Sequence, residues 1–255
     1  MLRKLLLIAL MLALCTSMVV PAQASTFSVR AVEPTDAEQV IRGFVKGQGY
    51  VYMNFGRYPF TREGDVRPCL WRVLAVENGY AFLLNEYCVD VNIYHHEKVD
   101  QPRWKDFDMY DYMNETMIAT MFTSDEQAAL EYSDELGRLF ILDNLEFMRL
   151  EYGFRKIFTQ PQKERECELT PYAATLEDAY IHQNGNTTYW SRTCRYTAAG
   201  GYEHIVGYDG HISMAGHTRK CAIRPACRVD LSMLDNVSGA GTFDNPFVFD
   251  VLPRN

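Results

Sequence analysis

Residues 69–88 read CLWRVLAVENGYAFLLNEYC, and they carry the clearest structural signal in the chain. Asn78-Gly79 separates two runs of apolar, aromatic and β-branched residues, and this dipeptide is preferred in the two-residue turn of a β-hairpin. If neither strand contains a bulge, Cys69 faces Cys88 across the hairpin. Opposed Cα atoms in antiparallel strands lie about 4.5–5.5 Å apart, which a disulfide accepts. The sequence therefore predicts a hairpin closed by a Cys69–Cys88 disulfide.

The first 24 residues have the pattern of a secretory signal peptide. Two basic residues precede an apolar run over residues 5–20, and Ala22-Gln-Ala24 matches a cleavage site. The run is short for a membrane span, so we expect cleavage after Ala24. Lipid attachment at Cys15 is a minor alternative, because the residue before it is large. We expect the protein to be secreted or held in the cell envelope.

Composition limits the classes of function. Removal of the signal peptide takes away two positive charges and no negative ones, so the net charge of −8 becomes −10. Phosphate backbones attract clustered Lys and Arg, and this chain has no such cluster, so nucleic acid is not an expected partner. No later segment is apolar and long enough to span a membrane. The 16 Tyr, 14 Phe and 3 Trp provide ample material for a core.

The order of predicted elements indicates a single α+β domain whose two ends share a sheet. We predict a linker over residues 25–33 and an N-terminal helix over residues 34–49. The domain covers residues 50–231, and a closing segment follows over residues 232–255. Helical spacing and capping patterns predict helices in the middle of the domain. Runs of aromatic and β-branched residues predict strands on both sides of them. The expected strands are 50–55, 69–76, 80–87, 138–142, 187–192, 203–208, 211–214 and 221–231, and the expected helices begin near 109, 123, 143 and 170.

The remaining cysteines are also expected to form structural disulfides, because exported proteins commonly contain them. Cys221 and Cys227 lie on one extended segment and are too far apart to pair with each other. Cys167 and Cys194 are therefore their partners, in either of two pairings that the sequence does not separate. No C-x-x-C or usual zinc spacing occurs, so scaffold disulfides are favoured over reactive thiols.

Few other residues suggest chemistry, and each has a simpler interpretation. Three histidines could approach one another as zinc ligands, but isolated histidines are more common. Three aspartates resemble a calcium loop without its glycine and distal glutamate, and a solvated helix start is favoured. The sequence therefore predicts no metal and no cofactor. These residues are His204, His211 and His217, and Asp106, Asp108 and Asp111.

The order of many short motifs resembles a bacterial exported family, the domain-of-unknown-function family 6273. The resemblance covers about residues 50–231 and depends on the order of the motifs, since no single motif would suffice. The motifs are Phe55-Gly-Arg-Tyr-Pro, Trp71-Arg-Val-Leu, Ala81-Phe-Leu-Leu, Glu86-Tyr, Trp104, Tyr112-Met-Asn, Phe122-Thr-Ser-Asp-Glu-Gln-Ala-Ala-Leu, Phe140-Ile-Leu, Tyr189-Trp-Ser-Arg and Ile223-Arg-Pro-Ala.

That family is in turn similar to the formylglycine-generating (sulfatase-modifying) and C-type-lectin-like group. The resemblance implies a disulfide-stapled C-type-lectin-like α+β fold with short antiparallel strands. In the formylglycine-generating enzymes, four residues separate a copper-binding cysteine pair that precedes the final arginine strand. Here five residues separate Cys221 from Cys227, and the pair straddles Arg224, so the catalytic residues do not carry over.

The sequence leaves three hypotheses for function. The first is a non-catalytic exported domain that binds a glycan or a protein at the cell surface, with Tyr189, Trp190, Arg192 and Arg224 as candidate ligand-binding residues. The second is a thiol- or metal-dependent oxidoreductase related to the formylglycine-generating enzymes. The third is a structural or adhesin-like envelope component. An enzyme is the less favoured interpretation, because disulfides would consume the thiols.

Overall fold

The computed structural model describes residues 33–97, 103–197 and 200–253. Residues 34–255 form one compact unit. The predicted signal peptide, its cleavage site and Cys15 lie outside the described residues. Within the described part, strands predominate and helices are short, so the α+β class is confirmed. No helix in that part has the length and apolar character that a membrane crossing requires.

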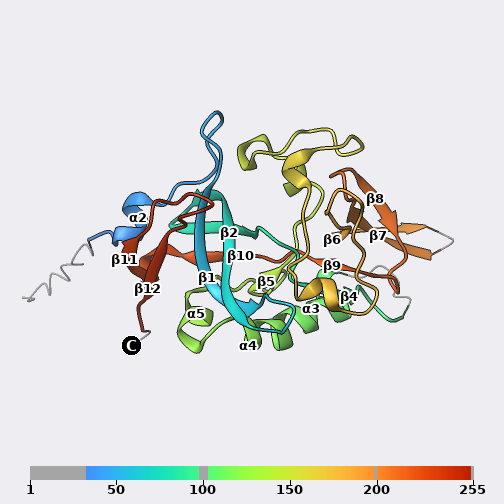
Figure 1. Cartoon of the computed structure of the whole chain (residues 1–255), viewed down its shortest axis with the longest axis horizontal. Coiled ribbons are helices and arrows are strands. Elements are labelled where there is room, and N and C mark those ends of the chain that lie inside the picture. The colour runs from blue at the N-terminus through green and yellow to red at the C-terminus, as the bar shows by residue number, and fades with distance from the viewer. Residues whose placement is uncertain (1–32, 98–102, 198–199, 254–255) are drawn as a thin grey trace, which may run out of the picture. The chain divides into compact units, whose positions relative to one another are not determined.

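The first five-stranded sheet contains the predicted hairpin. Its strand order is β1-β2-β3-β10-β5, and all its pairings are antiparallel. A strand from the end of the chain, β10, therefore lies beside β3 from its beginning, as expected from the sequence. Figure 1 shows β1 and β2 side by side, and in the sheet β3 separates β2 from β10. The strands are β1 (Val51–Pro59), β2 (Val66–Glu77), β3 (Tyr80–Asn85), β5 (Leu139–Phe140) and β10 (Ala226–Asp230).

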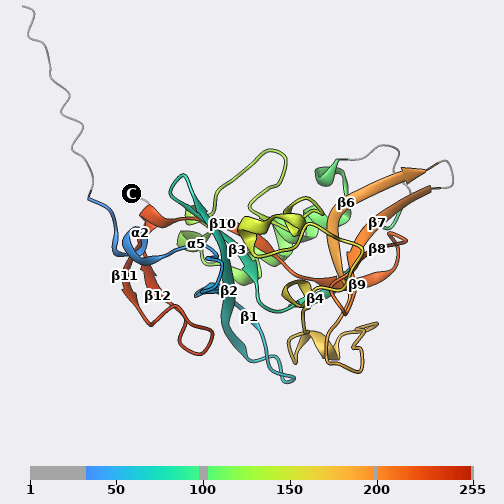
Figure 2. The same ribbon diagram turned by 90° about the horizontal axis from the view of Figure 1, so that it is seen from above.

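A second five-stranded sheet has the order β4-β9-β6-β7-β8, and β6, β7 and β8 lie at the right of Figure 2, away from β1 and β2. The chain passes between the two sheets four times, and two of these passages, from β3 to β4 and from β9 to β10, are short. The amide of Asn85 donates to the Pro225 carbonyl and that of Val89 to the Ile223 carbonyl, so the two passages run side by side. The strands are β4 (Asp90–Ile93), β6 (Tyr189–Thr197), β7 (Gly200–Val206), β8 (Ile212–Ala215) and β9 (Lys220–Ile223).

The helical region packs against the first sheet, below β1 and β2 in Figure 1. Its apolar residues recur at helical spacing, and Met109, Met113 and Met117 are fully buried. Thr123 and Glu126 form the predicted capping box. The elements are α3 (Asp108–Asp111), a π-helical turn over Tyr112–Met117, α4 (Ile118–Met121) and α5 (Ser124–Ala129).

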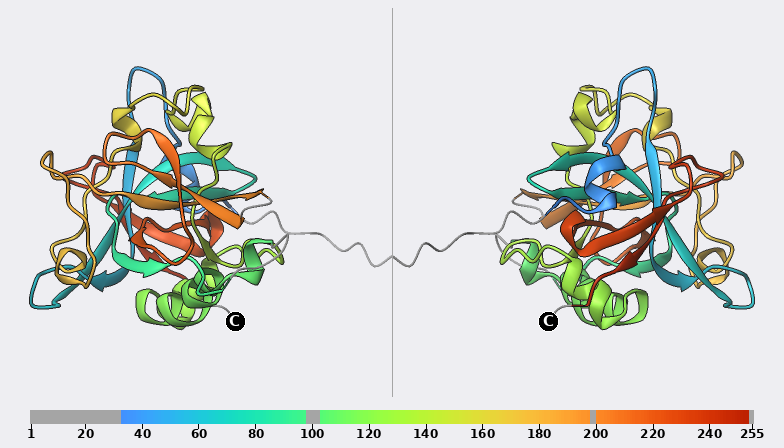
Figure 3. Two further views of the ribbon diagram at one scale, coloured as in Figure 1. Left: turned by 90° about the vertical axis from the view of Figure 1, so that its right-hand side faces the viewer. Right: turned by 90° about the vertical axis from the view of Figure 1, so that its left-hand side faces the viewer.

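The predicted helix at 34–49 is much shorter in the structure, where α2 covers Asp36–Val40. It lies against the two-stranded pair of β11 (Leu234–Ser238) and β12 (Val248–Val251), which Figure 3 shows on its right. The hydroxyl of Thr35 donates to the Leu231 carbonyl at 2.8 Å and joins the two segments.

Three other predicted elements differ from the structure. The helix predicted from Thr170 to about residue 181 is reduced to one 3-10 turn over Ala173–Thr175. The capping contacts of Asp143 with Glu146 form as expected, but they begin a 3-10 turn. The strand predicted over 221–231 is divided into β9 and β10 at Arg224-Pro225, where the chain leaves one sheet for the other.

The hairpin is confirmed, but its register corrects the disulfide prediction. Asn78 and Gly79 both have positive φ, as the tight turn requires. Val73 pairs with Leu83 while Ala75 pairs with Phe82, so Leu74 is an extra residue in β2. The bulge shifts the pairing by one, and Cys69 no longer lies opposite Cys88.

None of the six described cysteines is in a disulfide, so the stapled scaffold is not seen. Cys88 approaches Cys167 instead of Cys69, with the sulfurs 3.4 Å apart. The two predicted pairings of Cys167 and Cys194 with Cys221 and Cys227 do not occur. Cys194 is on β6 of the second sheet, whereas Cys227 is on β10 of the first.

Candidate functional site

Three of the four predicted ligand-binding residues are in the core. Tyr189 and Trp190 are fully buried, and Arg224 is 1% exposed. The Trp190 indole N–H donates to the Asn92 carbonyl, and its ring packs edge-on against Tyr94. In this structure these side chains fill the interior and do not form a ligand surface.

Arg192 is the predicted residue that reaches a pocket. Its Nε donates to the Ile141 carbonyl at 3.1 Å and its Nη2 to Glu146 at 2.9 Å, which fixes the side chain. Among the described residues, no hydrogen bond of Nη1 is found. The adjoining space, named here the Trp104–Arg192 pocket, has a volume of about 490 Å³. Its lining residues are Arg103, Trp104, Lys105, Asp134, Glu135, Leu136 and Arg192.

The walls of this pocket are held by local structure. Trp104 begins a 3-10 turn and is 7% exposed, and its indole N–H donates to the Leu136 carbonyl at 3.2 Å. That bond connects the turn to the loop that carries Asp134 and Glu135. The pocket therefore combines an apolar aromatic wall with three cations and two carboxylates.

Arg224 lies at the centre of a second polar cluster, where the two sheets join. Its Nε donates to the Asn85 carbonyl at 2.8 Å, and Nη1 to the Tyr189 hydroxyl at 3.3 Å. Its Nη2 is buried and has no acceptor among the described residues. An unpartnered buried N–H group is costly and marks a position where an anionic group would be stabilised.

The Cys167 thiol is one titratable group that the charge of Arg224 affects. Burial acts to raise the pKa of this thiol, but the hydrogen bond from Cys88 and the nearby Arg224 guanidinium outweigh burial and lower the pKa below its usual range. Burial and the Cys167 sulfur raise the pKa of Cys88. The two thiols therefore differ in acidity as an attacking thiol and a resolving thiol do in dithiol proteins.

A pocket of about 340 Å³ leads to Cys167. Arg72 forms a two-bond ion pair with Glu86 at its edge, at 2.9 and 2.7 Å. Its other lining residues are mostly charged or polar, so the approach to the thiol is hydrophilic. They are Tyr87, Lys163, Glu166, Glu168, Asn186 and Phe243.

The other sequence candidates are dispersed. His204 bonds Asn144, His211 pairs with Asp209, and His217 faces Glu203 at 3.9 Å. The three do not form a metal cluster in the part of the chain that the structure describes. Asp106 binds Arg103 and Asp108 contacts two histidines, so the three aspartates do not form a calcium loop.

Sequence reasoning missed the residues around Arg192 and the Cys88–Cys167 pair. Lys105, Asp134 and Glu135 have no distinctive spacing, and only the fold brings them to Arg192. Cys88 and Cys167 meet because Cys88 bridges Leu169 in parallel fashion. No pattern in the sequence predicts that bridge.

Comparisons with protein-family models, curated proteins and solved structures find no match for this chain. The resemblance to family 6273, and the C-type-lectin-like fold that it implies, therefore stay predictions.

Proposed function

We propose that this chain is an exported domain that binds a glycan at the bacterial surface through the Trp104–Arg192 pocket. The observation that carries the proposal is the position of Arg192, which lines a pocket of about 490 Å³ together with Trp104 and exposed charged side chains. This volume is in the range of small-ligand sites, about 300–1,000 Å³.

The chemistry of the pocket favours a sugar over a phosphate or a purely apolar ligand. Sugar hydroxyls both donate and accept hydrogen bonds, so they suit a wall that carries cations and carboxylates together. Arg103 pairs with Asp106 and Arg192 with Glu146, so these two cations are balanced and the pocket has no excess of positive charge. A glycan without an acidic substituent is therefore the preferred class of ligand.

A glycan array tests the proposal, with Lys105→Ala and Glu135→Ala as variants. Both side chains are exposed and make no hydrogen bond among the described residues, so their removal should leave the fold intact. Lys46→Ala is the matched control, because Lys46 is an exposed cation on the turn between Val45 and Gly49. We expect wild type and Lys46→Ala to bind the same glycans with equal affinity. The affinity of the two pocket variants for these glycans should be about tenfold lower. A blank array, or equal retention by all four proteins, would contradict the proposal.

A second candidate function is thiol–disulfide exchange, which the Cys88–Cys167 geometry favours. The Cys167 thiolate would attack one sulfur of a small hydrophilic disulfide, forming a mixed disulfide and releasing one thiolate, which takes a proton from water to become a thiol. Cys88 would then lose its proton and attack the Cys167 sulfur, releasing the second thiol. The substrate disulfide is reduced to two thiols while the protein dithiol is oxidised to a disulfide.

Rapid mixing of the reduced protein with a chromogenic aromatic disulfide tests this second function. Cys167→Ser should abolish the fast phase, and Cys88→Ser should trap the mixed disulfide at Cys167. Cys194→Ser is the control, because Cys194 is half-buried on β6 and away from Arg224. A fast phase that survives in Cys167→Ser would exclude Cys167 as the attacking thiol.

A further inference from the structure

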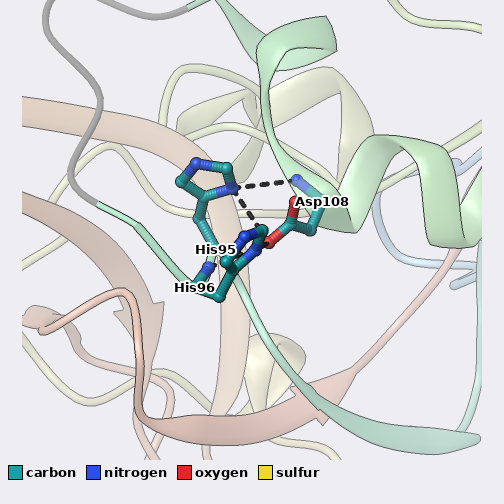
Figure 4. A group of neighbouring side chains, drawn as sticks. All are labelled: His95, His96 and Asp108. Carbon is teal, nitrogen blue, oxygen red and sulfur yellow. Dashed lines mark hydrogen bonds and ion pairs between the residues drawn. The ribbon is translucent and has the colours of Figure 1, made fainter.

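A cluster of two histidines and one aspartate lies outside both sites described above. His95 and His96 follow the end of β4, and Asp108 begins α3. Figure 4 shows the three side chains converging from these two elements. One ligand atom from each residue can be chosen so that all three lie within 4.8 Å of one another.

The backbone fixes the two histidines. The amides of Tyr94 and His95 both donate to the His217 carbonyl, at 3.0 and 3.2 Å. The buried His95 ring packs edge-on against Phe107. The His96 amide donates to the Asp108 carboxylate at 2.9 Å, so the aspartate is held against the turn that carries both imidazoles.

Two short contacts hold the His95 ring against Asp108. Its Nδ1 lies 3.2 Å from the Asp108 amide nitrogen and 3.0 Å from an Asp108 carboxylate oxygen. Either a proton on Nδ1 or a bound cation would balance the charge of the carboxylate at this position. The Nδ1 of His96 contacts the same carboxylate oxygen, so three donor atoms converge on one point.

We propose that His95, His96 and Asp108 form a zinc site. Imidazole nitrogens and a carboxylate oxygen are ordinary zinc ligands, with bonds of about 2.0–2.2 Å. Ligand atoms around one such ion lie roughly 3.3 Å apart by that geometry, so small side-chain rotations suffice. Three protein ligands leave a fourth position for water. The His96 side chain is 62% exposed, which gives the ion a path from solvent.

The experiment uses protein stripped with a chelator and kept reduced. Zinc affinity is measured at pH 7.5 by competition with a chromophoric chelator. We expect one zinc ion per chain, with affinity lowered at least about 10–100-fold in His96→Ala and in Asp108→Asn. His211→Ala is the matched control, because His211 forms a similar ion pair with Asp209 but belongs to no group of three ligands among the described residues. Its zinc affinity should equal that of wild type.

Cobalt replaces zinc to identify the donor atoms. A nitrogen and oxygen site gives weak visible bands, whereas bound thiolates add strong charge-transfer absorption in the near ultraviolet. We expect visible bands without thiolate absorption in wild type, and their loss in His96→Ala, whose circular dichroism should match wild type. Absence of zinc binding, unchanged affinity in His96→Ala, or a thiolate spectrum would each overturn the assignment.

Discussion

The sulfurs of Cys88 and Cys167 lie 3.4 Å apart in the core, although 79 positions separate the two residues in the chain. Oxidised glutathione should join them, because small rotations bring the sulfurs to bonding distance. A bridge closing so long a loop should raise the free energy of unfolding by about 2–4 kcal/mol. Peptide mapping without reduction identifies the linked cysteines. Urea denaturation of the oxidised and the reduced protein measures the difference in unfolding free energy. A Cys69–Cys88 linkage would contradict the register of the hairpin.

Arg224 should control the reactivity of Cys167. In Arg224→Gln the cation beside the thiol is lost, so the pKa of Cys167 should rise and its alkylation at neutral pH should slow. The buried acceptors that Arg224 satisfies lose their donors, which should lower stability by about 2–4 kcal/mol. Alkylation of half-buried Cys194 in the same sample provides an internal control. Equal slowing at Cys194 would indicate a general change in structure.

The hairpin could be predicted from the sequence, but its register could not. Asn78-Gly79 sets the turn through local backbone geometry, which neighbouring residues determine. The bulge at Leu74 depends on a remote segment, because the Phe44 amide donates to the Leu74 carbonyl at 3.1 Å. A contact between residues 30 positions apart leaves no periodic trace, so the predicted partner of Cys88 is wrong.

Gly43 should be essential to that bulge. A Cβ at position 43 would stand 2.5 Å from the Cα of Ala75, and backbone cannot move aside as a flexible side chain can. We expect Gly43→Ala to lower the free energy of unfolding by about 1–3 kcal/mol. Gly216→Ala is the control, because nothing lies within 4 Å of its Cβ position. Equal stability of the two variants in urea would show that the bulge tolerates the methyl group.

The candidate site is partly predictable from the sequence. Motif order directs attention to Trp190 and Arg192, but Trp190 is fully buried whereas Arg192 lines a pocket, and the pairing of β6 is irregular between Trp190 and Cys194. The sequence does not show that Trp104, rather than Trp190, lines the pocket beside Arg192. It also gives no sign of the proposed zinc site, because Asp108 reaches the two histidines only through the fold.

Glu203 should make stability depend on pH. It is 1% exposed on β7, and burial raises the pKa of its carboxyl to about 7 from an ordinary value near 4.5. Between these values the folded state binds more protons than the unfolded state, so the free energy of unfolding should fall as pH rises from about 4.5 to about 7. The loss should reach up to about 3 kcal/mol, at about 1.4 kcal/mol per pKa unit.

Glu203→Gln isolates this contribution, because an amide has the shape of the protonated acid but does not titrate. We expect the variant to be more stable than wild type at pH 8 and close to it at pH 4, since only the wild-type carboxyl must ionise in a buried position. The control is Glu151→Gln, whose carboxyl is exposed and makes no hydrogen bond among the described residues. Urea denaturation at several pH values measures the difference. If Glu203→Gln and wild type lose stability in parallel over this range, another group carries the pH dependence.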